Sequence, residues 1–133
     1  MLPIYPQSVE ITLDHRPLLH PRFAALRVGI SEFTFANIYL FRATHCYRLS
    51  TLEDGSLVLL GRDKGVSFFM LPFGLPPSHL IKQLLTDQGM MKCATKAQAE
   101  ILAALGYRVL SDRDNFDYLY RRQDLALLSG RYY

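Results

Sequence analysis

The segment 31–42, SEFTFANIYLFR, constrains the fold of this chain more than any other. Placed on a helix at 100° per residue, its apolar side chains cover almost the whole circumference. A helix that is apolar all round is normally buried within a core. Ser31 is a suitable N-cap, and Glu32 places a negative charge at the positive end of the helix dipole. We therefore predict a buried helix over 31–42, around which the other elements pack.

The size and composition are those of one ordinary globular domain. The chain has 133 residues, of which 50% are hydrophobic and 20% charged, so its core needs neither a disulfide nor a metal. Its 15 Lys+Arg against 12 Asp+Glu form no basic arm for nucleic acid. Cys46 and Cys93 fit no metal or redox spacing, which predicts buried free thiols in a reducing compartment. With no signal peptide and no apolar run long enough for a transmembrane segment, a cytoplasmic location is expected.

The periodicity and the turn residues predict an alternating succession of strands and helices. A strand at 9–13 precedes a helix that begins at Pro21 and stops near Gly29, and the 31–42 helix follows. Short turns at 54–55 and 62–65 join strands at 46–52, 57–60 and 66–71 into an antiparallel meander. The remaining elements are a helix at 79–88, a strand at 91–94, a helix from the capping box 95–98 to Gly106, strands at 107–110 and 116–120, and a last helix from 123.

This order, β-α-α-β-β-β-α-β-α-β-β, is the layout of the GNAT (acyltransferase) fold. The predicted fold class is therefore α/β (α+β), a GNAT-like mixed twisted sheet with helices on both faces.

Three stretches, 31–42, 112–120 and 124–131, are similar to a known family. They resemble the N-terminal half of a bacterial family related to the C-terminal domain of phosphatidylglycerol lysyltransferase, and the similarity runs along nearly the whole chain. The resemblance implies a tandem pair of GNAT-like domains, akin to the Fem-type aminoacyltransferases that use aminoacyl-tRNA. In such proteins the Gly-Arg near the end opens a basic stretch leading into the second domain. Because this chain stops at 130–133, residues 1–133 are expected to form the first half of such a pair, with the second half absent.

The loop that would bind coenzyme A in a GNAT enzyme is unsuited to that role. Such enzymes hold the pyrophosphate on the backbone N–H groups of a glycine-rich loop between the fourth strand and the next helix. Here the stretch 71–78 has three prolines, which lack N–H donors, and one glycine. Acetyl-CoA is therefore not expected to bind in the usual manner.

The candidate substrate-binding residues come from two segments. Asn37, Tyr39 and Arg42 include polar groups of the central helix, and each has the alternative role of a core residue with a bonded polar atom. In the second segment the candidates are Arg113, Asn115, Tyr118 and Tyr120, which would line a polar cleft at the sheet edge.

The second segment also has other interpretations, a calcium-binding loop and two purely structural roles. Carboxylates alternate over 112–117 as in a calcium loop, but the turn glycine is missing, which favours a charged hairpin turn. Tyrosines that alternate along a strand are more often half-buried packing than lining of a cleft. Four scattered histidines share no metal-ligand spacing, and no serine or cysteine lies in a nucleophile elbow. The sequence therefore predicts no metal site and no cofactor, and it leaves any catalytic residue unknown.

The leading hypothesis from the resemblance is the first GNAT-like domain of an aminoacyltransferase-type protein, incomplete on its own. The donor would be aminoacyl-tRNA and the acceptor a lipid or peptide. The expected partners are the second GNAT-like domain, aminoacyl-tRNA and a second copy bound through an exposed domain face. A non-catalytic interaction module is the alternative, and a conventional acetyl-CoA N-acetyltransferase is the third.

Overall fold

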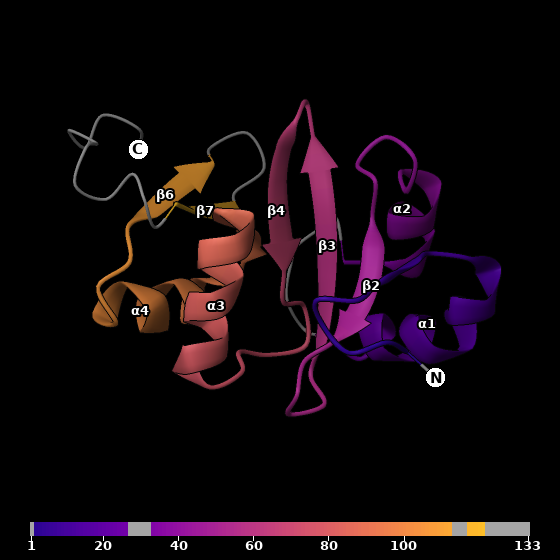
Figure 1. The fold of residues 1–133 in the computed structure, drawn as a ribbon, viewed down its shortest axis with the longest axis horizontal. Helices are drawn as coiled ribbons and strands as arrows, with labels where there is room; N and C mark the ends of the chain where they lie inside the picture. The colour runs from indigo at the N-terminus through magenta and orange to yellow at the C-terminus, as the bar shows by residue number, and fades with distance from the viewer. Residues whose placement is uncertain (1, 27–32, 113–116, 122–133) are drawn as a thin grey trace.

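A computed structural model of the chain describes residues 2–26, 33–112 and 117–121 (Figure 1). Its seven strands form one sheet in the order β1-β2-β3-β4-β5-β7-β6. Every neighbouring pair is antiparallel except β4 and β5, which are parallel, so the sheet is mixed. The elements are β1 (Val9–Glu10), the 3-10 helix η1 (Leu13–His15), α1 (Arg16–Ala24), α2 (Phe35–Leu40), β2 (Arg48–Thr51), β3 (Leu57–Asp63), β4 (Val66–Met70), α3 (Ser78–Gln88), β5 (Met90–Ala94), α4 (Lys96–Ala104), β6 (Val109–Asp112) and β7 (Asp117–Arg121).

Helices cover both faces of this sheet. Successive strand residues point to opposite faces, so Leu59 joins the core beneath α1 and α2, whereas Val58 joins the core beneath α3 and α4. Figure 1 shows α1 and α2 beside β2, and α3 and α4 towards the other end of the sheet. The mixed α+β fold with helices on both faces is confirmed, and it is consistent with a GNAT-like architecture.

The central helix is shorter and less buried than its sequence predicts. α2 begins after Thr34, whose Oγ1 accepts a hydrogen bond of 3.0 Å from the Asn37 N–H, so the predicted N-cap is wrong. Ser31 and Glu32 lie outside the described residues. Phe35 and Ile38 are buried against the sheet, but Leu40 is 71% exposed and Phe41 39%. Only one side of this two-turn helix can face the sheet, so the apolar residues on its other sides remain at the surface.

The first helix also begins earlier than predicted. α1 starts at Arg16 and contains Pro21, which was expected as the first helical residue. An internal proline loses its hydrogen bond to the carbonyl four residues earlier, here that of Pro17 in the first turn. The first strand ends at Glu10 instead of Leu13, because the Thr12 hydroxyl and the His15 ring form a capping box that starts η1.

The elements with strong local signals are confirmed. Gly89 ends α3 in the left-handed conformation, at φ 89°, and Thr95 and Gln98 form the predicted capping box of α4. β3 and β4 are joined by the two-residue turn Lys64-Gly65, with φ of 53° and 81°, so β3 extends to Asp63 instead of Leu60. The predicted last helix from 123 and the turn residues 113–115 lie outside the described residues.

Candidate functional site

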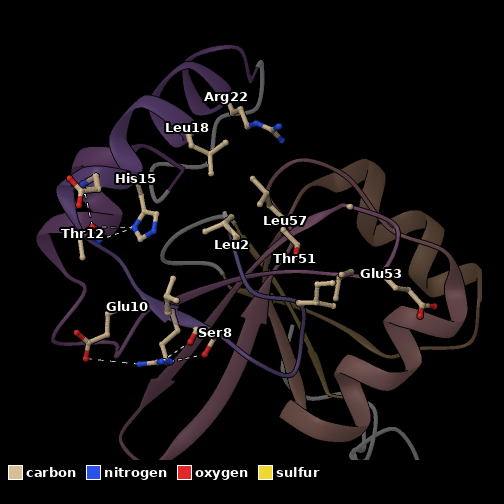
Figure 2. A pocket seen from close by; sticks show the side chains of 16 residues that line it. Leu2, Ser8, Glu10, Thr12, His15, Leu18, Arg22, Thr51, Glu53 and Leu57 are labelled. Atoms are coloured by element: carbon tan, nitrogen blue, oxygen red, sulfur yellow. Dashed lines mark hydrogen bonds and ion pairs between the residues drawn. The ribbon is translucent and has the colours of Figure 1, made fainter.

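Two adjoining hollows lie around the first strand. The larger has a volume of about 1090 Å³ and lies between the N-terminal segment, η1 with α1, and the turn between β2 and β3 (Figure 2). Leu2, Leu18 and Leu57 form its apolar centre, whereas charged side chains of both signs, among them Arg22 and Glu53, lie at its rim. A cavity of this size is typical of a small-molecule site, but the mixed rim selects no charge.

The smaller hollow, of about 430 Å³, lies on the side of the loop between α2 and β2. The side chains that line it are Glu10, Ile11, Arg42, Ala43, Cys46, Tyr47 and Arg48. Glu10 and Arg48 line both hollows. We refer to this smaller hollow as the arginine hollow.

Arg48 is held in place by Ser8, which lies forty positions earlier in the chain. Its Nε donates to the Ser8 hydroxyl at 2.7 Å and its Nη2 to the Ser8 carbonyl at 2.9 Å. Its Nη1 lies 4.0 Å from the Glu10 carboxylate, beyond hydrogen-bonding distance. The dashed lines at Ser8 and Glu10 in Figure 2 mark these contacts. Ser8 thus accepts from one edge of the guanidinium, and the Nη1 group makes no hydrogen bond to Glu10.

Arg42 and Tyr39, both candidates from the sequence, lie together. The Arg42 guanidinium carbon lies 3.7 Å from the centre of the Tyr39 ring, and its Nη1 donates to the Tyr39 carbonyl at 2.6 Å. Tyr39 in turn stacks on the buried Phe35 ring, with centroids 5.6 Å apart and planes at 16°. The aromatic stack fixes the direction in which this arginine points.

The other candidate residues are not gathered at this point. Asn37 is half-buried on α2, and its backbone is bonded within the helix. Arg113 and Asn115 lie outside the described residues. Tyr118 and Tyr120 occupy β7, opposite Ala94 and Met91 of β5. β3, β4 and β5 separate β7 from β2 in the sheet, so these three strands lie between the two tyrosines and β2, the strand that follows Arg42.

The connection from β4 to α3 has the features expected from its prolines. Pro77 precedes the first residue of α3, and no side chain caps the helix. The Glu53 carboxylate lies 3.1 Å from the His79 ring in the first turn of that helix. Glu53 therefore contacts a side chain of the first turn of α3, and among the described residues no side chain bonds the N–H groups at the start of this helix.

The cysteines and histidines form no metal centre among the described residues, where no cluster of three potential ligands occurs. Both cysteines are free thiols. Cys93 is buried as expected, whereas the expectation for Cys46 is wrong, since it lies exposed in the loop before β2. The His45 Nδ1 lies 3.8 Å from the Asp63 carboxylate, which is within ion-pair range but too long for a hydrogen bond.

Sequence reasoning missed Arg48, Glu10 and Cys46 as lining residues. Arg48 is the third residue of the strand predicted over 46–52, and its charge between the apolar residues Tyr47 and Leu49 was the available signal. Its partner Ser8 is remote in sequence, so no local pattern connects the two.

The fold and the hollows define a mixed α+β protein whose sheet carries helices on both faces. Its family is shown by a family model for "Phosphatidylglycerol lysyltransferase, C-terminal", which matches residues 23–133. The chain belongs to that family.

One solved structure has a similar fold: the "Conserved Protein of Unknown Function from Bacteroides thetaiotaomicron VPI-5482". The TM-score is 0.69 at 18% sequence identity over 85% of this chain, which is a likeness of fold alone. The present chain spans 40% of the length of that protein. No curated protein matches the sequence significantly. Within the described part of the chain, no helix is both long and apolar enough to cross a membrane.

Proposed function

We propose that this chain is a GNAT-like domain of an aminoacyltransferase-type protein, in which an amine or hydroxyl of a lipid or peptide acceptor attacks an aminoacyl ester carried by tRNA. The family match over residues 23–133 is the observation that carries this proposal. The mixed sheet with a parallel β4–β5 pair supports it, because a GNAT-like arrangement is what the proposal requires.

In this scheme the domain shapes the acceptor cleft, and a second GNAT-like domain completes the catalytic centre. The arginine hollow is the candidate for that cleft, because five of its seven lining residues fall within the family match. The larger hollow is lined mainly by residues before position 23. Tyr118, Tyr120, Arg113 and Asn115 remain proposed contributors from the far end of the sheet.

An acyl-CoA donor fits this chain poorly. The three prolines within 71–78 leave few N–H donors for a pyrophosphate before α3. The donor in the proposed reaction, an aminoacyl ester of tRNA, comes from the family resemblance.

The proposal is tested with the full product of the reading frame and with this chain alone. Each is incubated with tRNA charged with radiolabelled lysine and with vesicles containing phosphatidylglycerol or, separately, a peptide acceptor. Label transferred to either acceptor by the full product supports the proposal. The absence of both transfer and binding of charged tRNA by the full product would contradict it, as would a saturable calorimetric signal with acetyl-CoA.

A non-catalytic interaction module is the second candidate. The exposed Leu40 and Phe41 at the end of α2 favour it, because adjacent exposed apolar side chains are typical of contact surfaces. Self-association of the chain, measured by sedimentation, together with no binding of charged tRNA, would favour this reading.

A further inference from the structure

We propose that the arginine hollow binds a singly charged oxyanion, the phosphodiester or carboxylate group of a small molecule, between Arg42 and Arg48. This proposal concerns the hollow that the proposed function takes as the acceptor cleft, but its test measures anion binding and does not depend on aminoacyl transfer. Arg42 and Arg48 both line the same 430 Å³ hollow, which is large enough for such a group and its immediate substituents.

Arg42 is half-buried, and its position is fixed by the Tyr39 ring and carbonyl. No carboxylate of residues 2–26, 33–109 lies within 4.0 Å of it. Removing a guanidinium partly from water costs free energy unless an anion or hydrogen-bond acceptors compensate. The hydrogen bond to the Tyr39 carbonyl uses one of its five N–H groups, so most of its donors remain for a ligand.

Arg48, the first residue of β2, also has N–H donors left for a ligand. Ser8 uses its Nε and Nη2, and the 4.0 Å separation leaves Nη1 without a hydrogen bond to Glu10. Carboxylate and phosphodiester groups each carry two oxygens that can accept paired hydrogen bonds from one guanidinium group. Two arginines that are already held in position lose little side-chain entropy on binding.

The charge of the lining sets the preferred ligand. Two arginines and one glutamate give the hollow a formal charge of +1. A monoanion neutralises that charge, whereas a dianion would leave an excess negative charge beside Glu10. The Glu10 side chain is 83% exposed, so it weakens anion binding without closing the hollow.

Cys46 offers a direct report of occupancy. It is exposed and lines the arginine hollow, whereas Cys93 is buried. The rate at which iodoacetamide alkylates Cys46, followed by peptide mass spectrometry, is measured with increasing dimethyl phosphate, a phosphodiester, or acetate, a carboxylate. Sodium chloride at matched ionic strength is the reference.

We expect at least one of the two ions to slow alkylation of Cys46 about threefold or more, saturably, beyond the effect of chloride. Arg42→Gln and Arg48→Gln should each raise the half-protecting concentration at least about fivefold, because each removes a charged donor. Arg62→Gln is the matched control: Arg62 is exposed on β3 and lines neither hollow, so this loss of one charge should change protection less than about twofold.

Glu10→Gln keeps the test decisive if an arginine variant fails to fold. Removing this exposed carboxylate should lower the half-protecting concentration about two- to fivefold. Protection by dimethyl phosphate alone assigns the site to phosphodiesters, and protection by acetate alone to carboxylates. The proposal is overturned if neither ion protects beyond chloride, if the folded arginine variants match the wild type, or if Glu10→Gln leaves protection unchanged.

Discussion

Among the glycines that the structure describes, Gly61 on β3 is the one where an added methyl group would meet other atoms. A Cβ built there would lie 2.4 Å from Cζ and 2.7 Å from Cε1 of Phe68, which is far inside van der Waals contact. The backbone of Gly61 does not have the positive φ that favours glycine. Glycine is therefore needed here for space, because the Phe68 ring occupies the volume that a side chain would fill.

The size of the effect follows from how tightly that ring is held. To restore an ordinary contact of 3.4 Å, the ring must move by about 1 Å. Phe68 is 2% exposed, the Tyr47 ring meets it edge-on with centroids 6.3 Å apart, and the Lys92 Nζ lies 4.4 Å from its centre. Overpacking of a core costs about 1–3 kcal/mol, and a ring confined in this way places Gly61→Ala near the upper end, about 2–3 kcal/mol.

Urea unfolding followed by far-ultraviolet circular dichroism measures this loss, which should also lower Tm by about 10 °C in a domain of this size. Phe68→Leu provides the control, since leucine lacks the ring atoms that a Cβ at position 61 would meet. In that background Gly61→Ala should cost less than about 1 kcal/mol, giving a coupling energy of at least about 1 kcal/mol. Equal costs in both backgrounds, or a cost below about 0.5 kcal/mol in the wild type, would refute the reasoning.

Three further substitutions test polar contacts. Burial, with a smaller contribution from Asp87, raises the pKa of Tyr5 from 10.0 to about 12. Because the pKa is higher in the folded state, the contribution of Tyr5 to stability is fully present below pH 10 and is lost as the pH rises towards 12. The stability advantage of wild type over Tyr5→Phe, measured by urea unfolding, should therefore be about 1 kcal/mol smaller at pH 11.5 than at pH 9. Gln98→Ala should cost about 2–3 kcal/mol in urea unfolding, since its buried Nε2 donates to the Leu71 carbonyl at 3.0 Å; a cost no greater than that of an exposed α4 residue would contradict this. Thr95→Ala should cost about 1 kcal/mol through loss of the N-cap, with Thr95→Ser retaining most of the stability.

Local signals predicted the middle and later elements well. The Thr95–Gln98 capping box, the left-handed Gly89 and the Lys64-Gly65 turn each act through neighbouring residues, so the chain itself carries the information. The start of α1 was misplaced because proline is favoured in a first turn, and both Pro17 and Pro21 satisfied that rule.

The extent of burial could not be obtained in the same way. The apolar residues around α2 predict a fully buried helix, yet burial depends on which side meets the sheet and on what else covers the remainder. The site residues likewise differ in whether a local sequence signal identifies them. Arg42 was identified because it interrupts an apolar segment, whereas Arg48 depends on Ser8, which only the pairing of β1 with β2 brings near.

The end of α2 at Leu40 explains the position of Arg42. A helix that ends leaves its last carbonyls without helical partners, and cations are favoured beside them. Because α2 ends at Leu40, the Tyr39 carbonyl can accept from both the backbone N–H of Arg42, at 3.3 Å, and its Nη1. The Arg42 carbonyl in turn accepts from the Tyr47 N–H at 3.0 Å, which ties this residue to the start of β2. The end of α2 at Leu40 therefore places the Arg42 guanidinium over the Tyr39 ring, at the wall of the arginine hollow.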